Sequence, residues 1–252
     1  MQNVIGNVDR LTKAASVEEL WCIHQQLMAE CGFDRLLYGY TRYRTSNGLG
    51  DPRDWVILST QKPEYMKAFI DDGFYHNAPM IQWALENDGA CSWRWLTETA
   101  SRGNLTPAEM RVMAFNKSMQ VTAGYTVSFR SVSQRSKGAI ALTAKPGLTQ
   151  DQVDNMWAEN GDAIIVMNNV LHLKLLSLPY SGERKLTTRQ REVLQWVGDG
   201  KTTQDIAVLL GLTPATIEKH LRLARQTLDA ETTAQAILKA AFYNQMFGAD
   251  SR

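Results

Sequence analysis

The chain has 252 residues, of which 44% are hydrophobic and 21% are charged, and its formal net charge is +1. This length allows one large domain or two modest ones, and the composition is too apolar for a disordered chain. The small net charge excludes a uniformly basic, histone-like protein. It leaves nucleic-acid binding by a local basic patch open.

The cysteines and the apolar runs indicate in which cellular compartment the protein resides. The three cysteines, Cys22, Cys31 and Cys91, are odd in number and have no CxxC spacing, which argues against a disulfide framework and a zinc site. The start of the chain lacks a signal-peptide pattern, and apolar runs such as residues 163–167 are far shorter than the roughly 20 residues that span a bilayer. We therefore expect a cytoplasmic protein without a metal, a cofactor or a membrane partner.

The first 176 residues predict a mixed α and β domain. Helical spacing of apolar residues, caps and Pro positions predict helices over residues 17–31, 63–71, 79–86, 106–119 and 149–175. Aromatic, branched or alternating residues predict strands over residues 36–43, 54–59, 125–132 and 139–144. Because helices flank a mostly sequential run of strands, we expect the α+β class, with an antiparallel sheet in an α/β/α sandwich.

A linker and a helical domain follow. Residues 177–185 (SLPYSGERK) contain Pro, Gly and two Ser, a composition that interrupts regular structure. Residues 186–252 predict four helices, the last ending near residue 247. Thr187 or Thr188, Thr202 or Thr203, Thr213, and Thr232 or Thr233 are placed to cap them. The middle pair, joined by a short turn at Gly211, has helix-turn-helix spacing.

The second helix of this pair predicts a buried face and an exposed one. Ile217, Leu221, Ala224 and Leu228 recur at helical steps, and we expect them to pack against Ile206, Leu209, Leu210 and Trp196. The opposite face carries Glu218, Lys219, Arg222 and Arg225. Side chains on such a face reach base edges when the helix lies in a major groove.

Residues 186–236 (LTTRQREVLQWVGDGKTTQDIAVLLGLTPATIEKHLRLARQTLDAETTAQA) closely resemble the LuxR-type DNA-binding domain. The resemblance implies base contacts from Glu218, Lys219 and Arg222, and phosphate-side contacts from Lys201, Thr202, Thr216 and His220. For His220, a packing role is the alternative. The sequence departs from the family at Gln190, where the family has Glu, and at residues 231–233, where a basic residue is missing.

The stretch PEYMKAFIDDGFYHNAPMIQWALENDGACSW resembles the autoinducer-binding domain of quorum-sensing regulators. The resemblance places ligand-contacting positions at Tyr65, Phe69, Ala78, Trp93 and Gly124. Tyr40 is a further candidate. The alternative for these aromatic residues is an ordinary hydrophobic core.

Ala78 is the informative departure, because the family has an Asp there that accepts a hydrogen bond from the amide N–H of the ligand. An alanine side chain has no acceptor. A buried amide left without an acceptor costs roughly 1–3 kcal/mol. Asn77 is adjacent, and its amide oxygen is a candidate substitute.

Together these features predict a two-domain transcriptional regulator, with a sensor domain over residues 1–176, the linker and a DNA-binding domain over residues 186–252. The implied partners are an acyl-homoserine lactone, an inverted-repeat promoter site, a second copy of the chain and RNA polymerase. An orphan regulator that senses another molecule or none, and a partner protein that does not bind DNA, remain as alternatives. No catalytic constellation is present, so we do not expect an enzyme.

Overall fold

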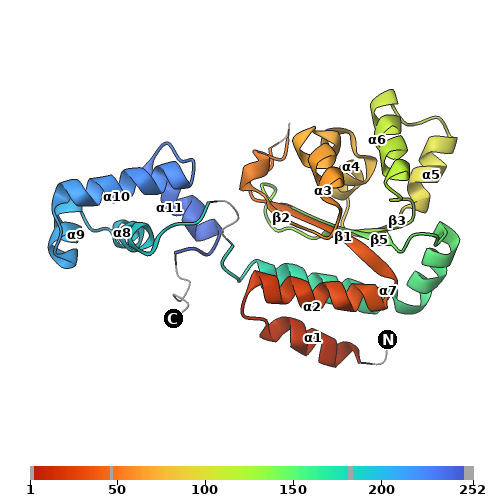
Figure 1. The fold of residues 1–252 in the computed structure, drawn as a ribbon, viewed down its shortest axis with the longest axis horizontal. Coiled ribbons are helices and arrows are strands. Elements are labelled where there is room, and N and C mark those ends of the chain that lie inside the picture. Colours follow the sequence, from red (N-terminus) through yellow and green to blue (C-terminus); the bar gives the residue numbers. More distant parts are fainter. Residues whose placement is uncertain (1–2, 46–47, 181–183, 247–252) are drawn as a thin grey trace. The chain divides into compact units, whose positions relative to one another are not determined.

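The computed structural model describes residues 3–45, 48–180 and 184–246. The chain divides into two compact units, Met1–Lys174 and Leu175–Arg252. Figure 1 shows a sheet with helices on both faces in the first unit, and helices in the second. The α+β class, the α/β/α sandwich and the helical second unit predicted from the sequence are therefore confirmed. Within the predicted linker, residues 181–183 lie outside the described residues.

The described part of the first unit contains a five-stranded sheet with the order β2-β1-β5-β4-β3, in which all neighbours are antiparallel. The strands are β1 (Phe33–Thr41), β2 (Val56–Ser59), β3 (Gly89–Ser92), β4 (Gly124–Phe129) and β5 (Lys137–Ala144). β1 and β5 pair along their length, from Phe33 opposite Ala144 to Thr41 opposite Lys137. The centre of the sheet thus joins segments that are far apart in the sequence.

One face of the sheet is covered by α2 (Val17–Glu30) and α7 (Gln150–Leu175), with α1 (Val4–Lys13) packed against α2 (Figure 1). Aromatic side chains fill this interface: Phe129 stacks on His172 of α7, and Tyr125 stacks on Trp157. Because side chains alternate along a strand, the residues between them face the other way.

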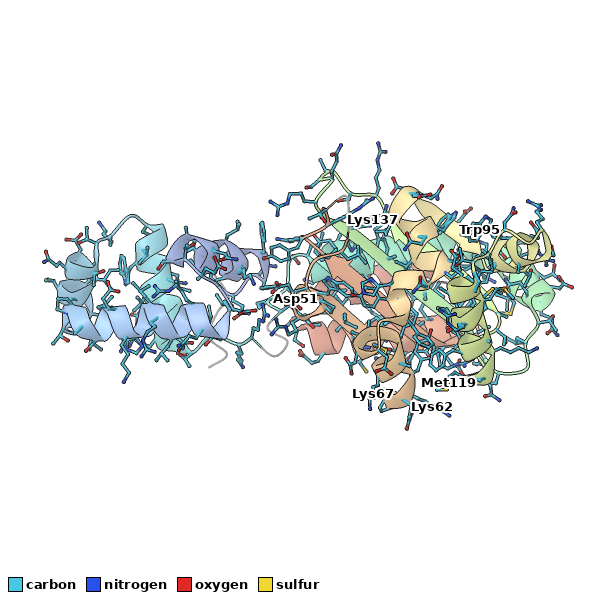
Figure 2. All side chains as sticks on the ribbon, turned by 90° about the horizontal axis from the view of Figure 1, so that it is seen from above. Asp51, Lys62, Lys67, Trp95, Met119 and Lys137 are labelled. Atoms are coloured by element: carbon cyan, nitrogen blue, oxygen red, sulfur yellow. The ribbon has the colours of Figure 1, made fainter. Side chains whose placement is uncertain are left out.

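The opposite face is covered by four shorter helices: α3 (Pro63–Met66), α4 (Pro79–Glu86), α5 (Arg94–Ser101) and α6 (Pro107–Ser118). A π-helical turn, Lys67–Asp71, extends α3. Its outer side is polar, and the side chains of Lys62 and Lys67 extend away from the unit (Figure 2). The helix predicted over residues 106–119 is confirmed, and it begins with a capping box formed by Thr106 and Glu109.

Three elements, α1, β3 and α5, were not predicted from the sequence. β3 has four residues and is held by its pairing with β4, which is a tertiary contact that no local pattern reports. α5 has only eight residues and buries none of them fully, so its sequence offers too few apolar positions for a helical period to be recognised.

The described part of the second unit contains α8 (Thr188–Gly198), α9 (Thr203–Leu210), α10 (Pro214–Thr227) and α11 (Thr233–Phe242). Their N-caps are Thr187, Thr202, Thr213 and Thr232. The last helix ends at Phe242 rather than near residue 247, which lies outside the described residues.

The core of the second unit differs from the prediction at one position. Ile217, Leu221, Ala224 and Leu228 pack with Ile206, Leu210 and Trp196 as predicted. Leu209 is 51% exposed, so its predicted burial was wrong. Ile206, Ala207 and Leu210 form the buried face of α9, and the helical turn carries Leu209 outside it.

Candidate ligand cavity and DNA-binding face

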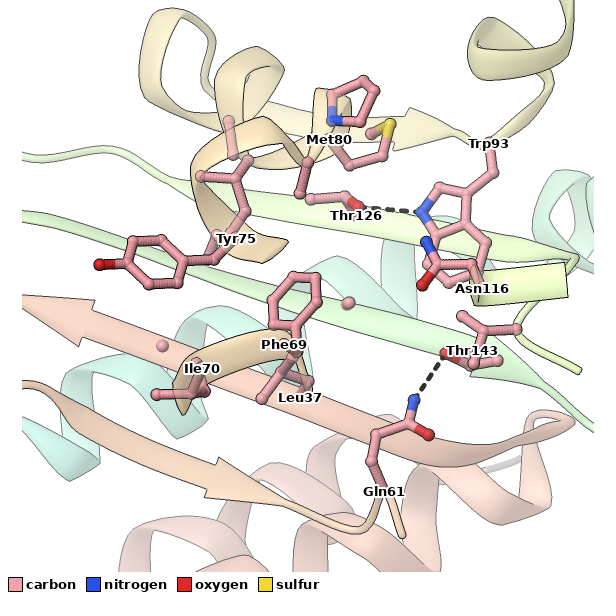
Figure 3. A pocket seen from close by; sticks show the side chains of 18 of the residues that line it. Leu37, Gln61, Phe69, Ile70, Tyr75, Met80, Trp93, Asn116, Thr126 and Thr143 are labelled. Carbon is pink, nitrogen blue, oxygen red and sulfur yellow. Dashed lines mark hydrogen bonds between the residues drawn. The ribbon is translucent and has the colours of Figure 1, made fainter. Parts of the chain in front are cut away.

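A cavity of about 590 Å³ lies between the sheet and helices α3 to α6. Strands β1, β2, β4 and β5 supply one wall, and the helices and the turns between them supply the other (Figure 3). Most of the side chains are apolar, among them Leu37, Ile57, Phe69, Ile70, Met80, Ile81, Ala84, Leu96, Met113 and Ala141. A cavity of this size and character suits one small amphipathic molecule.

Buried aromatic side chains form much of the helical wall. Tyr65 and Phe69, one turn apart, stack with ring centroids 5.4 Å apart. Trp55 and Tyr75 meet edge to face at 4.9 Å. Rings in such contacts have fixed orientations, so this wall offers a ligand a defined surface.

Trp93 is held at the cavity by the strands behind it. Its indole Nε1 donates a hydrogen bond to Oγ1 of Thr126, at 2.9 Å (Figure 3). Gly124 leaves room for the indole, because a Cβ at this position would meet the carbonyl oxygen of Leu142 and lie 3.0 Å from Cζ3 of Trp93. Gly124 therefore seats Trp93 without lining the cavity itself.

Two further hydrogen bonds fix polar side chains in the wall. The hydroxyl of Tyr65 donates to Oδ1 of Asn116 at 3.0 Å, and Nε2 of Gln61 donates to Oγ1 of Thr143 at 3.3 Å. Burial raises the pKa of Tyr65 well above its usual range, so this phenol stays protonated and remains a donor.

The cavity brings together Tyr65, Phe69, Ala78 and Trp93, four of the ligand-binding residues expected from the sequence. Tyr40 borders the cavity, but its ring packs against His172 of α7, on the opposite face of the sheet. Strand alternation explains this, because the neighbouring Gly39 and Thr41 face the cavity side.

Asn77 is exposed and does not line the cavity. It ends a 3-10 turn, Phe74–Asn77, whose buried residue is Tyr75, and the following Ala78 faces inward. The expectation that Asn77 substitutes for the missing acceptor therefore has no support in this geometry.

The residues that line the cavity, all of them within the described ranges, include no Asp and no Glu. The buried lysine among them, Lys137, donates to a carboxylate oxygen of Asp88 at 2.7 Å and to the carbonyl of Asn87. A neutral ligand matches such a wall better than a cationic one.

Asn116, Gln61 and Thr143 are wall residues that sequence reasoning missed. Each is an ordinary polar residue on a helix, a turn or a strand, and no motif marks it. The inward direction of Thr143 follows from the alternation of β5, and the rest depends on tertiary packing.

The exposed face of α10, in the second unit, carries charged side chains. Lys219 and Arg222 are exposed, and neither has an ion-pair partner among the described residues. Glu218 is exposed and accepts a hydrogen bond from Thr203 at 2.9 Å, and Arg225 donates to Thr233. We call Glu218, Lys219 and Arg222, the base contacts that the family resemblance implies, the base-contacting face.

The residues expected at phosphates lie at the start of α9 and on α10 itself. Lys201 and Thr202 are exposed at the start of α9, where Thr202 caps the helix. Thr216 lies in the first turn of α10, and its hydroxyl is paired with that of Thr213. His220 is half-buried beside the core residue Leu221.

A cavity for a small amphipathic molecule, followed by a helix-turn-helix unit, defines a ligand-responsive DNA-binding regulator. The autoinducer binding domain matches residues 16–175, and the bacterial regulatory proteins of the luxR family match residues 184–240. The chain belongs to this family and is a quorum-sensing transcriptional regulator. The family consists of transcriptional regulators, which are not enzymes.

Relatives match over most of the chain. The HTH-type quorum sensing-dependent transcriptional regulator RpaR of Rhodopseudomonas palustris is 25% identical over 246 residues, which cover 94% of this chain and 90% of RpaR. The transcriptional activator protein ExpR of Dickeya dadantii is 23% identical, covering 68% and 70%. The structure of the N-acylhomoserine lactone dependent LuxR family factor CepR2 of Burkholderia cenocepacia matches with a TM-score of 0.53 at 14% identity, covering 69% and 94%, and supports the fold.

Other kinds of site find no support in the described part of the chain. No helix there is long and apolar enough to cross a membrane, and no cluster of His, Cys, Asp or Glu is arranged to hold a metal ion. Burial raises the pKa of Cys91 to about 11, so this thiol is not activated as a nucleophile.

Proposed function

We propose that the sensor, residues 1–176, binds an acylated lactone of the acyl-homoserine lactone class in the cavity between the sheet and helices α3 to α6. The apolar cavity of about 590 Å³ carries this proposal, because an acyl chain needs a long apolar surface and a lactone head needs a few fixed polar groups. Tyr65, Phe69, Ala78 and Trp93 are the ligand contacts that we propose, with Gly124 behind Trp93.

A second candidate is a neutral signal without an amide N–H, which would make this chain an orphan regulator. One observation favours it: Ala78 stands where the family has a carboxylate, and the described residues of the cavity wall include no Asp or Glu. An amide N–H in that position would lack its charged acceptor.

We further propose that the protein acts in the cytoplasm as a homodimer on an inverted-repeat promoter, where it meets RNA polymerase. Two-fold symmetry would place the two copies of α10 in half-sites about 34–36 Å apart, or a multiple of this spacing. Lys201, Thr202, Thr216, Glu218, Lys219, His220 and Arg222 are the proposed DNA contacts. A ligand that binds only the folded sensor stabilises that fold by mass action and so controls DNA binding.

The test combines two measurements on the full chain. The first is the melting temperature with N-acyl-homoserine lactones of increasing chain length and with alkyl γ-lactones that lack the amide. The second is mass spectrometry of any small molecule retained from the native host. A rise in melting temperature with the acyl-homoserine lactones supports the first candidate, and a rise with the alkyl lactones alone supports the second. Stabilisation by neither series, with no retained molecule, would contradict both.

A further inference from the structure

The amide of Asn116 is held by one of its two ends. Asn116 lies on α6, and its Oδ1 accepts the hydroxyl proton of Tyr65, which lies on α3, at 3.0 Å. Tyr65 is buried and Asn116 is half-buried, so this hydrogen bond is partly shielded from water and orients the amide. The two N–H groups on Nδ2 are then turned away from Tyr65.

Nδ2 of Asn116 has no hydrogen-bond acceptor within the described ranges. Asn116 lines the cavity, and Figure 3 shows its amide directed into it. Because this N–H is only partly buried, water can solvate it, and a ligand oxygen of suitable geometry can take the place of that water. The cavity therefore presents one oriented donor that the protein itself does not satisfy.

Tyr65 cannot supply this donor, although the family resemblance places a ligand-contacting position there. A phenol has one proton, and Tyr65 has given it to Asn116. The indole of Trp93, at another ligand-contacting position, has given its N–H to Thr126. Both aromatic donors are thus used inside the protein.

We propose that Nδ2 of Asn116 donates the hydrogen bond that binds the carbonyl oxygen of the ligand head, and that Tyr65 is its positioning residue. The proposal rests on the proposed function, which places the ligand in this cavity. It specifies the ligand class as an uncharged apolar molecule with a carbonyl head, for which an amide N–H is not required.

The test uses two probes of the same shape on the full chain. γ-Dodecalactone has a five-membered lactone ring and an octyl chain, and octylcyclopentane has a five-membered ring and the same chain but neither of the two lactone oxygens. We expect Asn116→Leu to weaken the lactone by about three- to ten-fold, the value of one neutral hydrogen bond, and to leave octylcyclopentane unchanged. Asn116→Asp keeps an acceptor for Tyr65 but turns a carboxylate toward the carbonyl, so it weakens the lactone further.

A spectroscopic signature separates hydrogen bonding from a general effect on the fold. The infrared carbonyl stretch of bound γ-dodecalactone should lie at lower frequency in the wild type and return toward its value in an apolar solvent in Asn116→Leu. Tyr65→Phe leaves the amide in place but unpositioned, so we expect a partial and broadened shift and weaker binding of the lactone alone.

Each outcome decides the matter. Equal affinities of the wild type and Asn116→Leu for the lactone, or an unshifted carbonyl stretch, overturn the assignment of Asn116 and leave the proposed function intact. Tighter lactone binding by Asn116→Asp shows that the ligand presents a donor there, which also overturns it. Wild-type protein that binds neither probe contradicts the proposed use of the cavity, and the inference falls with it.

Discussion

Ala78 is a position at which the cavity wall differs chemically from that of the family. It is buried in the wall beside Trp55, Tyr65, Phe69 and Trp93, and no carboxylate lies near enough to line the same space. A ligand amide therefore meets an apolar surface at this point, where the family offers a charged acceptor. The sequence alone identifies this departure, because it depends only on the alignment of one residue.

Ala78→Asp should separate the two candidate signals. For N-octanoyl-homoserine lactone, a carboxylate accepting the amide N–H is worth roughly 1.5–3 kcal/mol, so we expect binding about ten- to hundred-fold tighter. For γ-dodecalactone, which has no N–H, the buried charge is unpaired and binding should weaken. Titration calorimetry with both probes checks this. Ala78→Asn is the matched neutral control, and equal changes for both probes would show that position 78 does not face the amide.

Arg222→Ala should reduce sequence specificity in DNA binding. Arg222 is exposed on the base-contacting face without an ion-pair partner in the described ranges, and arginine binds guanine through O6 and N7. On a site selected from a random duplex pool, we expect a loss of about 1–3 kcal/mol and relaxed preference at one base position. Lys201→Ala is the control, since loss of a phosphate contact weakens all sequences alike and lowers the salt dependence. An unchanged preference in Arg222→Ala would refute the assignment.

At the scale of elements, prediction from the sequence succeeded where a local signal exists. Thr106 and Glu109 mark the start of α6 by a capping box, and Gly32 follows α2, so these boundaries needed no tertiary information. The edge strand β3 and helix α5 lack such signals, and their neighbours decide their structure. The cavity depends on both, because Trp93 lies between them.

Gly124→Ala should displace the indole ring of Trp93 from its position. A methyl group there collides with the backbone carbonyl of Leu142 and crowds the indole, so β4 or the ring must move. Overpacking of this kind costs roughly 1–3 kcal/mol, and we expect a lower melting temperature together with weaker ligand binding. Gly39→Ala on β1 is the matched control for stability, because a Cβ there meets no atom within 4 Å. A melting temperature equally unaffected in both variants would contradict this account.

The interface between the sheet and helices α2 and α7 should weaken in acid. Burial lowers the pKa of His24 to about 3 and that of His172 to about 4. Nδ1 of His172 forms a hydrogen bond with the hydroxyl of Tyr38 at 2.8 Å. Both histidines stay neutral in the folded protein, whereas the unfolded chain takes up protons near pH 6.5. Below that pH, each histidine lowers the free energy of unfolding by about 1.4 kcal/mol per pH unit.

Urea denaturation at pH 7.5 and pH 5.0 measures this loss, and we expect stability to fall as the pH falls. His24→Gln and His172→Phe remove one titrating group each, so each should make the dependence on pH shallower. If the free energy of unfolding changes equally between these pH values in the wild type and in the double variant, the histidines do not cause the loss of stability.

At the scale of the whole molecule, sequence patterns predicted the order of the two units but not the polar groups of the cavity. The N-cap and the buried face of α10 follow from local and periodic patterns, and the structure agrees with the prediction for both. Asn116, Gln61 and Thr143 come from α6, a turn and β5, and only the packing of these segments brings them to one wall. Tyr40 shows the same limit, because the face to which its ring points depends on the register of β1 within the sheet.

The proposed dimer gives the last prediction. Several apolar residues of α7 are buried in the sensor, including Val153, Ile164 and Leu171. Val166 and Leu173, two turns apart, remain 45% and 66% exposed on the same helix. Exposed apolar residues at this spacing form a narrow stripe, and we expect it to contribute to pairing of two copies.

Leu173→Arg should therefore weaken the dimer without unfolding the sensor. With ligand present at micromolar concentration, we expect sedimentation to show a dimer for the wild type and a larger monomer fraction for the variant. On DNA, the variant should lose affinity for an inverted repeat while its affinity for one isolated half-site stays the same, because only the repeat requires two linked copies of α10. Val132→Arg, at a fully exposed position away from α7, is the matched control. A liganded wild type that sediments as a monomer would decide against the homodimer.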